Sequence, residues 1–262
     1  MSKKKNPENS KKLLSSLTLI IILGAWYVST DLLELVSPKM LPSPTTVINT
    51  FSYKIKGGTV PDGSSLATHI MSSLKIALGG FCAGSIIGVP MGIGMAWNDK
   101  LNKFLKPLFD LLRPIPALAW IPLMILWLGI GYSSKVGIVF FASVIAATLN
   151  SYAGIMRTKD VHIWVAQTFG ASRKQLLFKV AIPTAMPMIF TGLRLALGSS
   201  WVALVAAELV AATSGLGYMI QMGRMVGRTD IIFVGMITIG LIGLLLSKGL
   251  ETLQKKYVKG DI

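Results

Sequence analysis

The sequence predicts an all-α membrane protein with about six transmembrane helices, and three features lead to this prediction. Hydrophobic residues make up 52% of the 262 residues and charged residues only 14%, whereas a soluble domain has about 25% charged residues. Long apolar runs recur along the whole chain. Lysines and arginines gather between alternate runs. A bilayer supplies the apolar surroundings that such a composition requires.

Six apolar segments carry the predicted helices, because a helix needs about 20 mostly apolar residues to cross a bilayer. The first follows three lysines at positions 3–5 but lacks a small-residue cleavage site, so we expect an uncleaved membrane helix. Pro114, Pro116 and Pro122 interrupt the third segment, for which we expect a kink or a partly interfacial position. The six segments are roughly 13–35, 68–97, 114–130, 136–155, 184–212 and 231–250.

The distribution of positive charge predicts the topology. Eighteen lysines and arginines fall in the two ends of the chain and in the 98–113 and 156–183 loops, against six in the alternate loops. Such a bias marks the cytoplasmic side, so both termini are expected in the cytoplasm of a multi-pass protein of the cell membrane. The predicted organisation is a tail, first helix and external loop over 1–64, a transmembrane domain over 65–250 and a cytoplasmic tail over 251–262.

Composition also argues against several kinds of function. The net charge of +15 lies beside apolar runs, which indicates a lipid bilayer as partner and no nucleic acid. Cys82 is the only cysteine, and His69 and His162 lie far apart, so we expect neither a metal site nor a catalytic cluster. No P-loop motif occurs in the sequence. We therefore expect a chain that is not an enzyme and binds no cofactor, with any ATP used by a partner subunit.

The second segment carries a ridge of glycines. Four of them recur every four residues and so share one helix face. Small residues allow helix backbones to approach closely in lipid, which predicts tight packing rather than chemistry. They are Gly80, Gly84, Gly88 and Gly92.

The sequence of the loop between the fourth and fifth segments predicts two short helices, separated by Gly170. Ser172 is placed to cap the second helix, and Gln175 completes a capping-box pattern. Pro183 is expected to end that helix before the next membrane segment. The loop also carries apolar residues at Val165, Phe169, Leu176 and Leu177. They indicate either a docking surface or an amphipathic helix on the membrane, and the physics alone does not separate the two.

This loop resembles the EAA motif of binding-protein-dependent ABC importer permeases. Ala166, Gly170 and Pro183 match the motif, and Val180 and Ile182 are mild replacements. The sequence departs from it at 164–165, where Trp and Val stand in place of the usual Glu and Ala.

Further motifs resemble the branch of these permeases for nitrate, sulfonate, taurine and bicarbonate. Together they span about 41–218 and occur at Leu41–Pro44, Arg113–Pro122, Gly192–Leu195, Ala207–Leu209 and Ser214–Tyr218.

The resemblance implies the fold and partners of a type I ABC importer permease. A permease homodimer would form the pathway, a P-loop ATPase subunit would dock under the 156–183 loop, and an extracytoplasmic binding protein would deliver a small anion. By resemblance we favour an aliphatic sulfonate or taurine over nitrate or bicarbonate. The residues that would carry the ATPase coupling are Ala166, Phe169, Gly170, Ala171, Ser172, Val180, Ile182 and Pro183.

Three residues of the fifth segment are candidates for the substrate pathway. Counted from Pro183, Arg194 falls near mid-membrane, so it is expected to contact either an anion or a structural partner. Trp201 and Glu208 follow on the same segment and suit either the pathway or packing. The alternative function is a secondary transporter driven by an ion gradient, which predicts intramembrane carboxylates and internal repeats.

Overall fold

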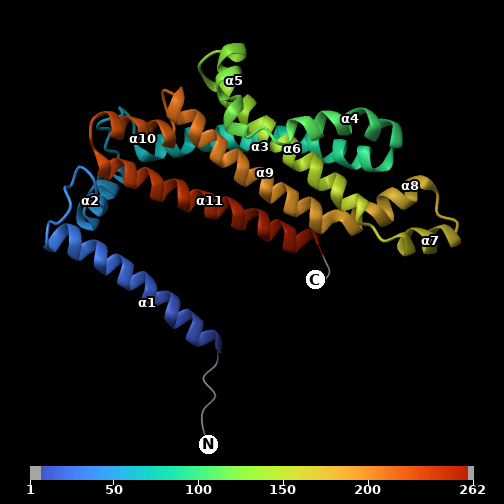
Figure 1. Ribbon diagram of the computed structural model, residues 1–262, viewed down its shortest axis with the longest axis horizontal. Helices are drawn as coiled ribbons and strands as arrows, with labels where there is room; N and C mark the ends of the chain where they lie inside the picture. The colour runs from blue at the N-terminus through green and yellow to red at the C-terminus, as the bar shows by residue number, and fades with distance from the viewer. Residues whose placement is uncertain (1–6, 259–262) are drawn as a thin grey trace, which may run out of the picture. The chain divides into compact units, whose positions relative to one another are not determined.

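The computed structural model describes residues 7–258, with the side chains of residue 14 and residues 16–258. The lysines at 3–5 and the final residues 259–262 of the predicted tails lie outside the described residues. Every regular element within the described range is helical, which confirms the predicted class. The elements (Figure 1) are α1 (Pro7–Tyr27), η1 (Val28–Leu32), α2 (Pro44–Ile55), α3 (Leu66–Trp97), α4 (Asp99–Leu112), η2 (Ala117–Trp120), α5 (Ile121–Leu128), α6 (Tyr132–Met156), α7 (Asp160–Thr168), α8 (Arg173–Gln175), η3 (Leu176–Ala181), α9 (Ile182–Val210), α10 (Leu216–Met225) and α11 (Thr229–Tyr257).

Four of these helical stretches are long and apolar enough to cross a membrane. A fifth span exists if the bent pair of α4 with η2 and α5 counts as one crossing. The apolar part of α1 together with η1, Ser16–Leu32, is shorter than the other spans. The described residues therefore hold four or five clear spans plus this shorter first helix, where the sequence predicts about six. The four are Leu66–Trp97, Tyr132–Met156, Arg173–Val210 and Thr229–Tyr257.

The third predicted segment is broken, as its prolines indicate. Asp99–Leu112 and Ala117–Leu128 meet at an angle of 90°. Arg113 caps the end of α4, and Pro116 begins the turn into η2. Proline has no N–H to donate and clashes with a preceding helical turn, which explains why a straight helix fails here.

The chain divides into two compact units. The first comprises the described part of Met1–Ala67 together with Met219–Ile237, and the second comprises Thr68–Tyr218 with the described part of Thr238–Ile262.

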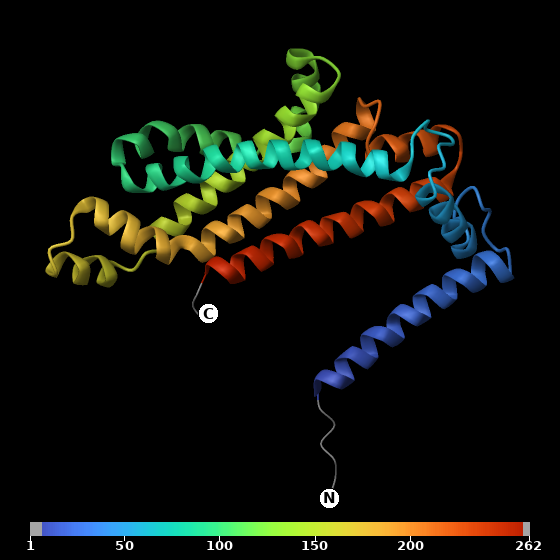
Figure 2. The same cartoon turned by 180° about the vertical axis from the view of Figure 1, so that it is seen from behind.

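In the second unit, α6 packs along α9, and α3 packs along α6 (Figures 1 and 2). The glycine ridge makes the second contact possible. A methyl group at Gly84 would lie 2.5 Å from the Cβ of Ser143, and one at Gly88 would lie 2.8 Å from the carbonyl oxygen of Val144. Any larger side chain would separate the helices, so the predicted packing role of the ridge is confirmed.

Two amphipathic helices, α2 and α4, lie in segments that the sequence analysis treats as loops. Ser43 caps α2 by accepting from the N–H of Thr46 at 3.3 Å, and Asn98 caps α4 in the same way. From the sequence, Lys54 is predicted to lie in an external loop. It is a buried residue of α2. Its ammonium group donates to the Asp62 carboxylate at 2.5 Å.

Candidate functional site

The loop between α6 and α9 folds as a helix, a glycine turn and a second helical segment that starts at Arg173, and the helix–turn–helix order is as the sequence predicts. After α7, the N–H of Ala171 donates to the carbonyl of Ala166 at 3.0 Å. Gly170 has a φ of +79°, which is the left-handed region where only glycine is comfortable. The Ser172 hydroxyl accepts from the N–H of Gln175 at 3.4 Å, and the Gln175 side chain accepts from the N–H of Ser172 at 2.8 Å. The predicted capping box is therefore confirmed.

The first half of this loop exposes large apolar side chains. Phe169 is 88% exposed, Trp164 62% and Val165 52%. A fixed turn that exposes an aromatic ring is expected to bind an apolar surface, either that of a partner protein or that of the membrane. We call these three residues the apolar tip of the loop.

The two leucines in the second half of the loop do not add to this surface, so the prediction for Leu176 and Leu177 is wrong. Leu176 is buried, and Leu177 packs against a core cluster. The reason is that both leucines belong to a helical segment that packs inside the second unit. The cluster consists of Ile155, Ala181, Ala185 and Ile189.

The prediction that Pro183 ends the second short helix is also wrong. Arg173–Val210 runs as one helical stretch of 38 residues. Within it, η3 is a π-helix, in which the N–H of Ile182 donates to the carbonyl of Leu177, five residues back. This register places Pro183 in the first turn of α9, where its missing N–H is tolerated. Val180 and Ile182 are half-buried in this stretch, so the loop is joined firmly to a spanning helix.

Arg194 lies on α9 next to the charged end of α11. Its guanidinium donates to the Gln254 side chain at 2.5 Å, and Gln254 directly precedes two lysines in the last turn of α11. Gln254 is thus a structural partner of Arg194, one of the two predicted contacts, and the mid-membrane depth of Arg194 stays a prediction. Arg194 is exposed, and it makes no hydrogen bond or ion pair with Glu208 among the described residues.

Trp201 lies in the contact between α9 and α11. Its side chain is 6% exposed, and the indole Nε1 donates to the carbonyl oxygen of Ile239 at 3.2 Å. Gly243 leaves room for the indole on the α11 side. These surroundings favour packing over a position in the pathway.

Glu208 is the centre of a buried polar cluster at the end of α9, where it is 1% exposed. The Ser73 hydroxyl of α3 donates to its carboxylate at 2.8 Å, and the N–H of Gly217 donates at 2.9 Å. Gly215 has a φ of +122°, and a Cβ at this residue would overlap the Glu208 carboxylate. The carboxylate therefore holds α3, α9 and the loop before α10 together.

Sequence reasoning missed the partners of Glu208. The Ser73 hydroxyl also accepts from the N–H of Leu216 at 2.9 Å, and the Nδ1 of His69 accepts from the N–H of Gly215 at 3.1 Å. Ser73 and Glu208 are 135 positions apart, so no spacing rule connects them. The closely spaced glycines of the Ser214–Tyr218 motif were the available signal.

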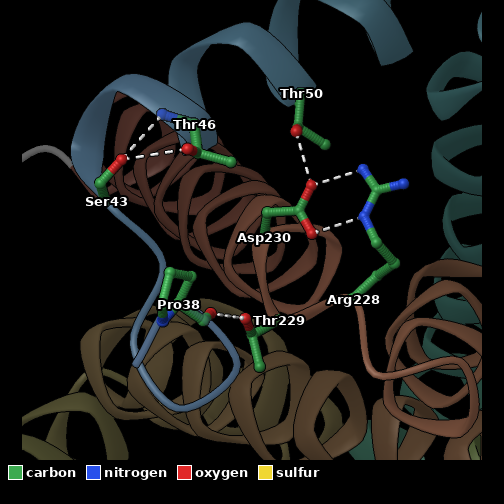
Figure 3. A network of polar contacts seen from close by, with 7 residues as sticks. All are labelled: Pro38, Ser43, Thr46, Thr50, Arg228, Thr229 and Asp230. Carbon is green, nitrogen blue, oxygen red and sulfur yellow. Dashed lines mark hydrogen bonds and ion pairs between the residues drawn. The ribbon is translucent and has the colours of Figure 1, made fainter. Parts of the chain in front are cut away.

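A second polar network lies in the first unit (Figure 3). Arg228 donates from Nε to Asp230 at 2.8 Å and from Nη2 at 2.6 Å, and the Thr50 hydroxyl donates to the same carboxylate at 2.6 Å. The hydrogen bond to Asp230 raises the pKa of the Arg228 guanidinium, which keeps it charged. The Thr229 hydroxyl donates to the carbonyl of Pro38 at 2.8 Å. These contacts tie α2 and the loop before it to the start of α11.

The described chain has apolar helices long enough to span a membrane, and one of them is continuous with an exposed loop of two helices and a glycine turn. This arrangement is typical of the membrane subunit of a transporter. The chain belongs to the family of binding-protein-dependent transport system inner membrane components, whose model matches residues 84–259. Members of this family are permease subunits of ABC importers. They work with a substrate-binding protein and leave ATP hydrolysis to a separate subunit.

Individual relatives cover nearly the whole chain. It is similar to the taurine transport system permease protein TauC of Escherichia coli, with 38% identity over 95% of this chain and 90% of TauC. It is also similar to the putative aliphatic sulfonates transport permease protein SsuC of Bacillus subtilis, with 33% identity over 91% of this chain and 84% of SsuC.

A solved structure confirms the fold. The inward-facing methionine ABC transporter MetNI matches with a TM-score of 0.63 and 19% identity, over 73% of this chain and 95% of the MetNI chain. The chain is thus a multi-pass ABC importer permease, as the sequence motifs imply.

Proposed function

We propose that this chain is one of two identical permease subunits of an importer for a small organic sulfonate, with both termini in the cytoplasm. Four relatives carry names that specify small substrates with an anionic group, namely taurine, aliphatic sulfonates, nitrate and bicarbonate. Identity is 38% for the taurine permease and 33% for the sulfonate permease, against 32% for the bicarbonate permease and 28% for the nitrate permease. This order supports a sulfonate as the substrate.

The observation that carries the coupling part of the proposal is the apolar tip at Trp164, Val165 and Phe169. Its turn is fixed by Gly170 and the capping box, and the following helix continues into a membrane span. Movement of a partner bound at the tip would therefore be transmitted along α9 without a flexible joint. Because Trp and Val occupy positions where the family motif has Glu and Ala, docking here rests on apolar contact.

The roles of the remaining loop residues follow from their places in the structure. Ala166 and Ala171 close the turn, and Ser172 fixes the start of the second helix. Val180, Ile182 and Pro183 lie on the stretch that joins the loop to α9.

The test starts from the tagged chain, purified in a mild detergent from its own membranes. Mass spectrometry identifies the captured ATPase and binding protein, and the mass of the complex gives the number of permease copies. Proteoliposomes holding this complex are then supplied with radiolabelled ethanesulfonate, taurine, nitrate or bicarbonate. We expect two permease copies and ATP-dependent sulfonate uptake. Capture of the chain alone, with uptake driven by an ion gradient, would favour the secondary transporter.

A further inference from the structure

A small cavity lies at the bend between α4 and η2, beside the middle of α6. Its volume is about 300 Å³, at the lower end of the range of about 300–1,000 Å³ for small-molecule sites. Arg113 and Trp120 line it from the bend, and Ser199 lines it from α9. The α6 residues among its lining are apolar and include Phe141, Ile145 and Leu149.

Two hydrogen-bond donors of this cavity are unused. Arg113 is exposed and makes no hydrogen bond or ion pair with another described side chain. The indole Nε1 of Trp120 is buried and has no hydrogen-bond partner among the described residues. A buried donor without an acceptor is rare in folded proteins. Its presence indicates that the acceptor of this hydrogen bond comes from a molecule other than the chain itself.

The position of Trp120 is fixed by packing. Its ring stacks on Phe141, with ring centroids 5.1 Å apart and planes inclined by 24°. Trp120 ends η2, which starts after Pro116, and both Trp120 and Arg113 line the cavity. A cation and a fixed N–H donor at one cavity suit an anion, because guanidinium and indole N–H groups donate hydrogen bonds and accept none.

The rest of the lining limits the kind of anion. Of the described residues that line the cavity, none carries a carboxylate, so an ammonium group would find no countercharge there. The α6 residues instead offer apolar surface to an aliphatic chain. We propose that this cavity is a binding site for an alkanesulfonate, with its sulfonate on Arg113 and Trp120 and its chain against α6.

This site rests on the proposed function, and it sharpens that function in two ways. It assigns the anion contact to Arg113 of the bend, not to Arg194, whose guanidinium is bonded to Gln254. It also predicts that a simple alkanesulfonate binds better here than the zwitterion taurine.

The experiment uses a cysteine at the cavity as a reporter. Ser199→Cys is made in a Cys82→Ser background, since Cys82 is an exposed free thiol. The purified full-length chain reacts with sulfonatoethyl methanethiosulfonate or with the trimethylammonioethyl reagent. Each rate is divided by the rate of the same reagent with a small free thiol.

We expect the normalised rate for the sulfonate reagent to exceed that of the ammonium reagent by about tenfold, the effect of one hydrogen bond to a charged group. Ethanesulfonate should slow the labelling more than taurine does. Arg113→Gln should abolish the preference. Trp120→Phe keeps the stacked ring and should reduce the preference.

Matched controls remove a positive charge and an indole N–H group at positions outside the cavity. Lys103→Gln deletes a charge from the exposed side of α4, and Trp127→Phe deletes an indole N–H from exposed α5; both should keep the preference. Equal normalised rates for the two reagents, or a preference unchanged by Arg113→Gln, would overturn the site.

Failure of the site and failure of the proposed function are distinguishable, because the labelling needs neither ATPase nor binding protein. A reconstituted importer that carries ethanesulfonate while labelling shows no preference overturns the site alone. An importer that carries no sulfonate overturns the proposed function, and with it the alkanesulfonate as the natural ligand of the cavity.

Discussion

Two loops of the second unit follow helix ends, and each depends on a glycine in the left-handed region. Gly170, with a φ of +79°, turns the loop between α7 and α8, and Gly215, with a φ of +122°, turns the loop before α10. Their surroundings are opposite. A Cβ at Gly170 would meet nothing within 4 Å, and the neighbouring Phe169 is 88% exposed. A Cβ at Gly215 would overlap the buried carboxylate of Glu208.

The comparison shows that a glycine turn with a positive φ serves two different purposes in this molecule. At Gly170 the turn presents side chains outward, which is useful only if something binds them. At Gly215 the turn brings backbone N–H groups to buried acceptors, which stabilises the joint between α3, α9 and α10. Stability is therefore expected to depend on the Gly215 loop, and partner binding on the Gly170 loop.

The largest loss of stability is expected for Glu208→Ala. It leaves the Ser73 hydroxyl and the Gly217 N–H without their acceptor in a buried site, which we expect to cost about 2–4 kcal/mol. The thermal midpoint of the purified chain in detergent measures the loss. Glu208→Gln keeps an acceptor oxygen and should lose less. A midpoint for Glu208→Ala equal to that of the parent would show that the cluster does not hold the helices.

A smaller but still clear loss is expected for Gly215→Ala. The added methyl group strains a positive φ and displaces the Glu208 carboxylate, for a combined cost of about 2–3 kcal/mol. The same thermal measurement applies. In the Glu208→Ala background the methyl group no longer meets a carboxylate. The loss of stability of the double variant should therefore be smaller than the sum of the losses of the two single variants. Full additivity would contradict the described contact.

The same substitution at Gly170 is expected to cost only about 1 kcal/mol, because strain at a positive φ is its sole penalty. Its main consequence should be weaker capture of the ATPase, since the direction of the apolar tip changes. Comparing the thermal midpoints of Gly170→Ala and Gly215→Ala tests the contrast between the loops directly. Equal midpoints would mean that the two turns have similar surroundings.

Local patterns predicted a good part of this molecule from its sequence. The apolar runs marked the spanning helices, and the four-residue glycine spacing marked the face of α3 that packs on α6. The Ser172–Gln175 pair marked a capping box, and the prolines after Arg113 marked a bend. Each is a short-range feature whose geometry is set within one or two helical turns.

The errors arose where distant parts of the chain decide the outcome. The π-turn of η3 accommodates Pro183, so the helix continues past it, and the partner of Arg194 lies 60 positions away on α11. Leu176 is buried and Leu177 packs against a core cluster, which no pattern within the loop reveals. The partners of Glu208 come from α3 and from the loop before α10. Such contacts are fixed by tertiary packing.

The central claim is that the apolar tip binds the ATPase subunit, and Phe169→Ser tests it most directly. The ring is 88% exposed, so the change in unfolding free energy should stay within about 0.5 kcal/mol. The matched control is Phe178→Ser, which makes the same substitution at an exposed phenylalanine of the π-helix η3, where the side chain is 65% exposed. Both variants are tagged and purified from their own membranes, and the ATPase recovered per permease is measured. We predict a loss of about tenfold for Phe169→Ser and parental recovery for Phe178→Ser. Parental recovery for Phe169→Ser at unchanged stability would contradict the claim.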